Sequence, residues 1–446
     1  MSADTSITVT PFTVMHEGVP LLHKGVPLEI AYNTPDQSYY LRQLEYWQKL
    51  GESGIKLRLR HAGLDGQRQK GQNVSDVEAM LVHIQDHHAV DFAFPLAGYP
   101  VGPIAVNKLR VLVTRATLPP TGTPGDWPHI HTYLESLLGA RPLQHHMAWW
   151  KWARKSLFGT ERLPGQVMIY VGPRNAGKSY LQTLTTRILG AADANPFPYL
   201  SGSTPFNADL FKATHLMVED ALADWGRGNR RKLGAKLKEL VVNHTHHCHG
   251  KGQEAINLPP KWRVTLSLNP EQENLAMLPP LDDSITDKLM LFSCGEGRFP
   301  VDFSEEDAWP KWSAIVDGEM PAFLHAIDNF AIPDCIKAPR FGVKSWLDPE
   351  LVAHDAESSV ESVFWSIIQH DLPVVLESAT EWTGAATDLE RLLSDRTMPS
   401  HAQADRILNW PGACGTYLGR LSKLRPANVV RWKKVKGQQV WRIIPD

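Results

Sequence analysis

The feature that most constrains this chain is an apolar run that ends in a glycine-rich loop. Residues 166–171 (QVMIYV) have the length of a buried strand, residues 172–179 are GPRNAGKS, and residues 180–189 have the composition of a helix. The loop matches the G-x-x-x-x-G-K-[ST] pattern, and the flanking strand and helix supply the context in which that pattern binds phosphate. Its glycines let backbone N–H groups point at a phosphate, and the helix N-terminus adds partial positive charge. The segment therefore predicts a nucleoside triphosphate site.

Two side chains of this loop carry the expected chemistry. Lys178 should reach the β- and γ-phosphates, and the Ser179 hydroxyl should ligate Mg²⁺. We expect Lys178 to balance phosphate charge without packing against the protein. The residues expected to surround ATP are Gly172, Pro173, Arg174, Asn175, Ala176, Gly177, Lys178, Ser179 and Tyr180.

Two further apolar runs end in polar side chains. Residues 213–218 are followed by Glu219 and Asp220, about forty residues after the glycine-rich loop, and residues 262–268 are followed by Asn269. One carboxylate of such a pair holds Mg²⁺, and the other orients or deprotonates the attacking water. Glu219 and Asp220 therefore join Ser179 in the expected Mg²⁺ site. Asn269 stands where a sensor of the γ-phosphate belongs, at the carboxyl end of a core strand.

The composition sets outer limits on the function. A chain of 446 residues is long enough for two or three domains. Its formal charge of −2 excludes a global polycation, so any nucleic-acid binding must come from local patches. Four cysteines without a C-x-x-C pair fit a reducing compartment. We find no secretory signal and no apolar run of bilayer length, and we expect a soluble cytoplasmic protein without a membrane partner.

The first part of the chain gives weaker signals. We expect residues 1–95 to form an N-terminal domain of unknown role. The alternation in residues 56–60 (KLRLR) predicts a strand with a basic face, which is more typical of a solvated edge strand than of a phosphate contact. Ser75 and Glu78 form a capping box that opens a helix.

Residues 96–160 are expected to form a linker and a helical collar. The helical stretch 127–158 contains Trp149, Trp150 and Trp152. Tryptophans can stack on bases, but packing within the collar is the favoured interpretation.

A histidine-rich segment leads into a lysine-bearing turn. Residues 243–250 (NHTHHCHG) contain zinc-type ligands, but alternate residues of a strand point to opposite faces and no second ligand cluster completes a site. We therefore interpret the segment as a polar strand. The turn at residues 250–252 (GKG) and the run 254–258 then complete a hairpin with Lys251 at its tip.

The ordered motifs between residues 172 and 269 resemble those of superfamily 3 helicases, specifically the helicase part of phage and plasmid primase-helicases. The resemblance covers roughly residues 90–446. It implies an α/β fold with an AAA+-like P-loop core and a parallel sheet, at residues 161–345, that binds ATP and Mg²⁺. It also implies a ring, usually a homo-hexamer, that moves along single-stranded DNA during replication.

The resemblance assigns further roles. Asn269 becomes the sensor and Lys251 the hairpin lysine that contacts DNA. Members of the family supply an arginine finger downstream of the sensor strand; here Lys288 stands at the expected position, and Arg298 is the other candidate. The N-terminal part shows no convincing primase signature, so priming is not implied.

Residues 346–446 are expected to form a C-terminal winged-helix DNA-binding domain. Three helical stretches precede a β-hairpin around a KKVKG tip, and residues 406–445 contain nine Lys or Arg and no Asp or Glu. A solvated charged face is the alternative interpretation. The side chains expected to contact DNA are Arg420, Lys423, Lys433, Lys434 and Lys436.

These features together predict an ATP-dependent DNA helicase of a phage, plasmid or mobile element. Its expected partners are single-stranded and forked DNA, further copies of the chain, and other replication proteins. Two alternatives stay open: an AAA+-like ATPase that loads or remodels a protein partner, and an ATP-switched protein that binds replication origins. The acids Glu219 and Asp220 disfavour the second alternative, because a switch needs no carboxylate to activate water.

Overall fold

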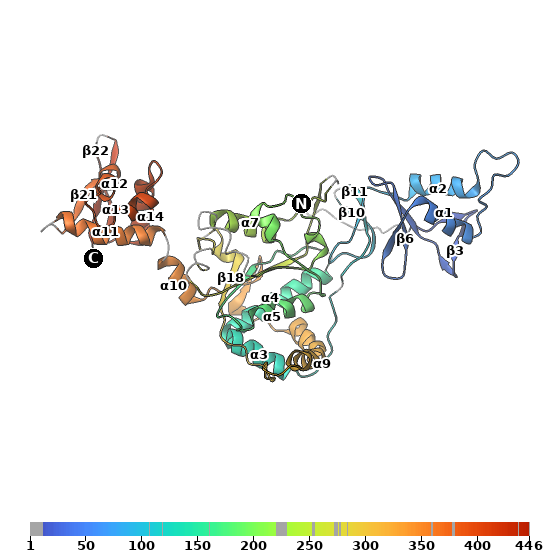
Figure 1. Ribbon diagram of the computed structural model, residues 1–446, viewed down its shortest axis with the longest axis horizontal. Helices are drawn as coiled ribbons and strands as arrows, with labels where there is room; N and C mark the ends of the chain where they lie inside the picture. Colours follow the sequence, from blue (N-terminus) through green and yellow to red (C-terminus); the bar gives the residue numbers. More distant parts are fainter. Residues whose placement is uncertain are drawn as a thin grey trace. The chain divides into compact units, whose positions relative to one another are not determined.

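The computed structural model describes residues 12–445, apart from 107, 118, 160, 220–229, 252–254, 272–274, 276–277, 283, 358–359, 377–379 and 436. The chain divides into two compact units, Met1–Asp348 and Pro349–Asp446 (Figure 1). No helix within the described ranges is both long and apolar enough to cross a membrane.

The first unit begins with small antiparallel hairpins and a four-stranded sheet. The hairpins are β1 (Met15–His16) with β2 (Val19–Pro20), and β3 (Leu22–His23) with β4 (Val26–Pro27). The sheet has the order β7-β6-β5-β8, from β5 (Ile30–Asn33), β6 (Ser38–Arg42), β7 (Trp47–Leu50) and β8 (Ala89–Val90). Helices α1 (Glu52–His61) and α2 (Asp76–His87) pack on it through a core that includes Ile55, Leu59 and Ile84.

Helix α1 corrects one prediction. Residues 56–60 are helical, and the predicted strand is wrong. Ile55 and Leu59, four residues apart, are buried, whereas Leu57 is 53% exposed. An alternation over only five residues is compatible with the two-residue period of a strand and with the 3.6-residue period of a helix. Here the buried residues follow the helical spacing. The capping box of α2 is confirmed, because Glu78 N donates to Ser75 Oγ and Ser75 N donates to Glu78 Oε2.

A second small sheet joins this region to the core. It has the order β10-β11-β9, in which β9 (Phe92–Phe94) runs parallel to β11 (Leu109–Val113), and β10 (Gly102–Val106) antiparallel to it. The segment after β9 is fixed to the core, because Ala97 N donates to Phe211 O at 2.9 Å and Lys261 Nζ donates to Gly98 O at 2.8 Å.

The centre of the first unit is a five-stranded, all-parallel sheet with the order β13-β14-β17-β12-β18. Its strands are β12 (Val167–Val171), β13 (Asp193–Ala194), β14 (His215–Glu219), β17 (Arg263–Leu268) and β18 (Leu289–Ser293). The residues of β12, β17 and β18 are all buried except Ser293, as expected for strands covered on both faces. The predicted α/β class with a parallel sheet is confirmed.

Helices cover both faces of this sheet. On one face lie α5 (Lys178–Ile188), the collar helices α3 (Pro128–Leu138) and α4 (Ala140–Phe158), and α9 (Ala308–Asn329); on the other lies α7 (Arg230–Val242) (Figure 1). Trp149 and Trp150 are buried among them, and Trp150 Nε1 donates to Thr185 Oγ1 of α5 at 3.2 Å. The collar tryptophans therefore pack as predicted.

Short elements complete the first unit. They are α6 (Phe197–Ser201), the 3₁₀ turns η1 (Leu210–Lys212), η4 (Thr286–Lys288) and η5 (Asp334–Ile336), the hairpin of β15 (His246–Cys248) with β16 (Ile256–Leu258), and the pair β19 (Lys337–Ala338) with β20 (Gly342–Val343).

The second unit places helices around a three-stranded antiparallel sheet. In chain order it contains α10 (Pro349–Glu357), α11 (Val360–Leu376), β21 (Trp382–Ala385), α12 (Ala386–Leu393), α13 (His401–Ile407), α14 (Ala413–Leu424), β22 (Val429–Val435) and β23 (Gln438–Ile443). The sheet order is β21-β23-β22. Phe364, Leu389, Leu418 and Trp441 lie in its hydrophobic core.

Candidate nucleotide site and its surroundings

The glycine-rich loop lies between β12 and α5, as the motif predicts. Gly177 precedes α5 with φ +105°, a conformation that side chains rarely adopt. A Cβ there would lie 3.1 Å from Tyr133, and a Cβ at Gly172 would lie 2.5 Å from Cys294 O. The two motif glycines are therefore required by backbone conformation at one position and by close packing at the other.

Lys178 makes more contacts than we expected. Its side chain is buried, and its Nζ donates to Gly172 O and Pro173 O at 2.7 Å and to Asn269 Oδ1 at 3.2 Å. The expectation that this lysine packs against nothing is wrong. The ammonium makes its hydrogen bonds to loop carbonyls and to the amide at the end of β17.

The parallel register brings three strand ends to one edge of the sheet. Val171 is paired with Leu268, and Glu219 with Ser267. Glu219 is exposed at this edge, and Asn269 follows β17 directly. Lys178, Glu219 and Asn269 thus gather where the loop opens. Asp220, the second predicted acid, lies outside the described residues.

A buried polar network lies beneath this edge. His215 of β14 is hydrogen-bonded to Thr186 Oγ1 of α5 at 2.7 Å and to Thr265 Oγ1 of β17 at 2.8 Å. Gln182 Nε2 also donates to Thr265 Oγ1, at 2.8 Å. Complete burial lowers the pKa of His215 to about 3, so the ring is neutral at physiological pH. The network links the helix of the phosphate loop to the strands that carry Glu219 and Asn269.

Sequence reasoning did not identify the residues that hold the loop from the collar side. Tyr133 of α3 donates its hydroxyl proton to Gly177 O at 2.8 Å, and Gly297 N donates to Ala176 O at 2.9 Å. Arg298 N donates to Ser136 Oγ at 2.7 Å, so Arg298 lies beside the phosphate loop of its own chain. The apolar spacing of α3 is the only local signal for Tyr133, and it indicates packing alone.

A polar cavity of about 540 Å³ opens beside this contact. It is lined by Thr132, Glu135 and Ser136 of α3 and by the loop after β18, which contributes Glu296, Gly297 and Arg298.

Lys288 does not have the surroundings expected of a finger residue. It immediately precedes β18, at the amino end of the sheet. Its side chain is buried, and its ammonium is paired with Asp287 of the same chain. The expectation that Lys288 serves as the finger is therefore corrected: this lysine forms an ion pair within its own chain.

The oxygen donors at the sheet edge fit a magnesium ion. The Ser179 hydroxyl stands exposed at the start of α5, and the Glu219 carboxylate is exposed at the end of β14. Hydroxyl and carboxylate oxygens are the ligands that Mg²⁺ prefers. Among the residues that can be described, which include the whole of 243–250, no group of three or more His, Cys, Asp and Glu could hold a metal.

The Lys251 hairpin is anchored to the core by an asparagine. Asn207 Nδ2 donates to His247 O at 2.7 Å, and His249 N donates to Asn207 Oδ1 at 2.9 Å. Asn207 N also donates to His249 O at 3.0 Å. These bonds hold β15 in place and leave Lys251 exposed beyond its end.

The predicted DNA-contacting cations of the second unit differ in their environment. Lys423, at the end of α14, and Lys433 and Lys434, on β22, are exposed. Arg420 donates to Glu361 Oε1 at 2.6 Å and lies 5.9 Å from the Tyr417 ring, so part of its role is structural. Lys436 lies outside the described residues.

Comparison with known proteins gives a likeness of fold. No protein-family model and no curated protein matches the sequence. Among solved structures, the apo structure of the NrS-1 C terminal region (305-718) matches with a TM-score of 0.55 at 13% identity, covering 94% of this chain and 96% of that one. A second structure of that region, the A form, matches with a TM-score of 0.52 at 11% identity, covering 94% and 97%. The likeness predicted from the motifs is confirmed at the level of the fold, which this chain shares with the NrS-1 C terminal region over nearly its whole length.

Proposed function

We propose that this chain is an ATP-dependent DNA helicase that works as a ring on single-stranded DNA. The observation that carries the proposal is the meeting of Lys178, Glu219 and Asn269 at one edge of a parallel sheet. A phosphate-binding lysine, a carboxylate and a sensor amide at that edge are the parts that nucleotide hydrolysis requires. The shared fold with the NrS-1 C terminal region supports the proposal.

Each side chain at the edge has a proposed task. Lys178 exchanges its bonds to Gly172 O, Pro173 O and Asn269 Oδ1 for bonds to the β- and γ-phosphates. This exchange frees the Asn269 amide to contact the γ-phosphate or the attacking water. Glu219 orients or deprotonates that water, and with Ser179 and Asp220 it would hold Mg²⁺, which neutralises phosphate charge when bound.

The cavity between α3 and the loop after β18 is the proposed place of the nucleoside. It adjoins Ala176 and Gly177 through the bonds from Gly297 and Tyr133, and polar side chains line it. The remaining residues of the loop, Pro173, Arg174, Asn175 and Tyr180, complete the enclosure of the phosphates. Because Lys288 is buried, we do not propose it as the cation that one subunit supplies to the ATP site of its neighbour.

The second unit is the proposed duplex-binding domain. The order helix, strand, helices, two strands supports a winged helix, in which β22 and β23 would be the wing. Lys423, Lys433 and Lys434 are exposed on its last helix and on the wing, where phosphate contacts would form. We expect these contacts to give affinity without sequence preference.

ATP turnover, measured with and without single-stranded DNA, tests the proposal. A helicase is expected to hydrolyse ATP faster when DNA is present, and Lys178→Ala is expected to abolish turnover under both conditions. Turnover that ignores DNA would favour the rival function, an ATPase that remodels a protein partner. Full ATP turnover by Lys178→Ala would contradict the assignment of residues 172–179 as the phosphate-binding loop.

A further inference from the structure

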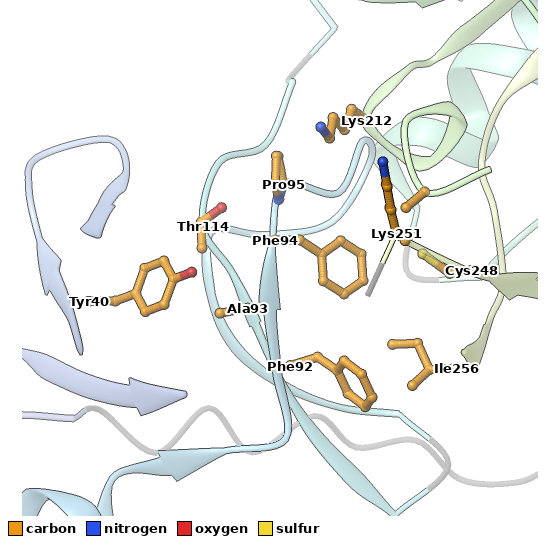
Figure 2. A pocket seen from close by; sticks show the side chains of 12 residues that line it. Tyr40, Phe92, Ala93, Phe94, Pro95, Thr114, Lys212, Cys248, Lys251 and Ile256 are labelled. Atoms are coloured by element: carbon orange, nitrogen blue, oxygen red, sulfur yellow. The ribbon is translucent and has the colours of Figure 1, made fainter. Parts of the chain in front are cut away.

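A cavity of about 360 Å³ separates the edge strand β9 from the Lys251 hairpin. Phe92 and Phe94 line one wall, and Lys251 with Ile256 lines the other. Figure 2 shows the Phe94 ring pointing toward Lys251 and the Phe92 ring pointing toward Ile256. Lys212, at the end of η1, contributes a second ammonium group. The volume falls within the range of roughly 300–1,000 Å³ that is typical of ligand sites.

Both walls of the cavity are fixed. Beyond β9, the backbone bond from Ala97 N to Phe211 O and the bond from Tyr99 Oη to Pro259 O, at 2.5 Å, tie the strand to the core. On the hairpin side, the bonds of Asn207 hold β15. The cavity is therefore a built feature of the first unit.

The chemistry of the lining is cationic and aromatic. Phe92 and Phe94 share one face of β9, because alternate residues of a strand point the same way. Lys212 and Lys251 are exposed, and none of the described residues that line the cavity carries a carboxylate. Burial raises the pKa of Cys248, which also lines the cavity, to about 12, so its thiol adds no negative charge at neutral pH.

We propose that this cavity binds single-stranded DNA, with a base stacked against Phe94 and the adjoining phosphates on Lys212 and Lys251. Proteins that bind single strands combine aromatic rings for the bases with a cationic track for the backbone, and the cavity supplies both. The inference deepens the proposed helicase function, on which it rests. It gives a role to β9 and to Lys212, in which the sequence shows no motif.

The proposed site has a sequence signal that is visible only in retrospect. Residues 92–95 are FAFP, an alternation that predicts a half-buried strand and nothing more. Lys212 and Lys251 are separated from it by more than a hundred residues, and only the fold brings them together.

Anisotropy of a fluorescein-labelled oligothymidylate, titrated with the full chain, tests the site. We expect Phe94→Ala to weaken binding tenfold or more, which corresponds to about 1.4 kcal/mol and lies in the range of base–aromatic stacking. Phe94→Leu, which keeps apolar volume without a π-face, should show most of this loss. Lys212→Ala removes an exposed side chain, so the fold is not at risk, and should lower the salt dependence of log Kd by about one.

Lys70→Ala is the matched control, because it removes one exposed lysine that does not line the cavity. Its affinity should stay within about twofold of the unchanged chain, a difference well below the tenfold step expected from stacking. Crosslinking of an oligonucleotide that carries 5-bromodeoxyuridine should label the peptide that contains residues 92–95.

The possible results separate the site from the function. Tight binding by the unchanged chain, with the same affinity for Phe94→Ala, Phe94→Leu and Lys212→Ala, would overturn the site and leave the helicase proposal standing. Crosslinks confined to other peptides would also overturn it. An unchanged chain that binds no single-stranded DNA would contradict the proposed function itself.

Discussion

Lys178→Met, which removes the ammonium and keeps the apolar stem, should both destabilise the chain and abolish its response to ATP. The ammonium is the shared donor for Gly172 O, Pro173 O and Asn269 Oδ1. The bonds to Gly172 and Asn269 are buried, so water does not replace them readily. Leaving a buried acceptor unpaired costs about 1–3 kcal/mol of stability. Part of this loss is offset, because the variant no longer buries a charged group.

We therefore expect a net loss of about 2 kcal/mol in the free energy of unfolding of the first unit. Urea unfolding followed by tryptophan fluorescence, without nucleotide, measures this loss. Adding a non-hydrolysable ATP analogue with Mg²⁺ should raise the midpoint of the unchanged chain by binding linkage and leave that of Lys178→Met in place.

Ser179→Ala is the matched control for this experiment. Its hydroxyl is exposed, so the nucleotide-free midpoint should not change, whereas the gain from the analogue with Mg²⁺ should fall. A Lys178→Met chain as stable as the unchanged chain would refute the hydrogen bonds that we assign to this lysine. A Lys178→Met chain that still gains stability from the analogue would refute its role at the phosphates.

Four further outcomes follow from the structure and the proposal. Turnover per subunit should rise with protein concentration as rings form, because a cation supplied by a neighbour is worth on the order of 10³-fold in rate; constant turnover by a monomer would argue against a ring. Lys251→Ala should reduce the stimulation of ATP turnover by single-stranded DNA, and equal stimulation would return this lysine to the role of a turn residue. The double variant Lys433→Ala, Lys434→Ala should weaken duplex binding and lower its salt slope by about two, whereas an unchanged slope would leave both lysines solvated. The pKa of His215 is about 3 in the folded chain against 6.5 unfolded, so the unfolded state binds the proton first and stability should fall as pH drops from about 6.5 toward 3; an acid-unfolding curve unaltered by His215→Gln would contradict this.

Local sequence patterns were sufficient to predict the elements that carry the candidate site. A strand, a glycine loop and a helix in immediate succession predict their own geometry, and the structure places β12 and α5 accordingly. The apolar runs before Glu219 and Asn269 likewise predict strands, and the parallel register then brings their ends together.

Sequence patterns did not predict the structure where it depends on residues far apart in the chain, or where the pattern covers only a few residues. Residues 56–60 fit two periods, and only the burial of Ile55 and Leu59 decides for a helix. No local pattern predicts the hydrogen bond from the Tyr133 hydroxyl to Gly177 O, because the two residues are 44 positions apart in the sequence. The burial of Lys288 could not be predicted either. Two adjacent charged residues, Asp287 and Lys288, are typical of an exposed turn, and only the position of β18 in the sheet buries the lysine.

Strand displacement on a forked duplex tests the central claim most directly. The full chain is mixed with a labelled fork and either ATP or its non-hydrolysable analogue, and release of the labelled strand is followed over time. We predict release with ATP, none with the analogue, and none from Lys178→Ala with either nucleotide. A chain that hydrolyses ATP in the presence of the fork but never releases the strand would contradict the assignment as a helicase.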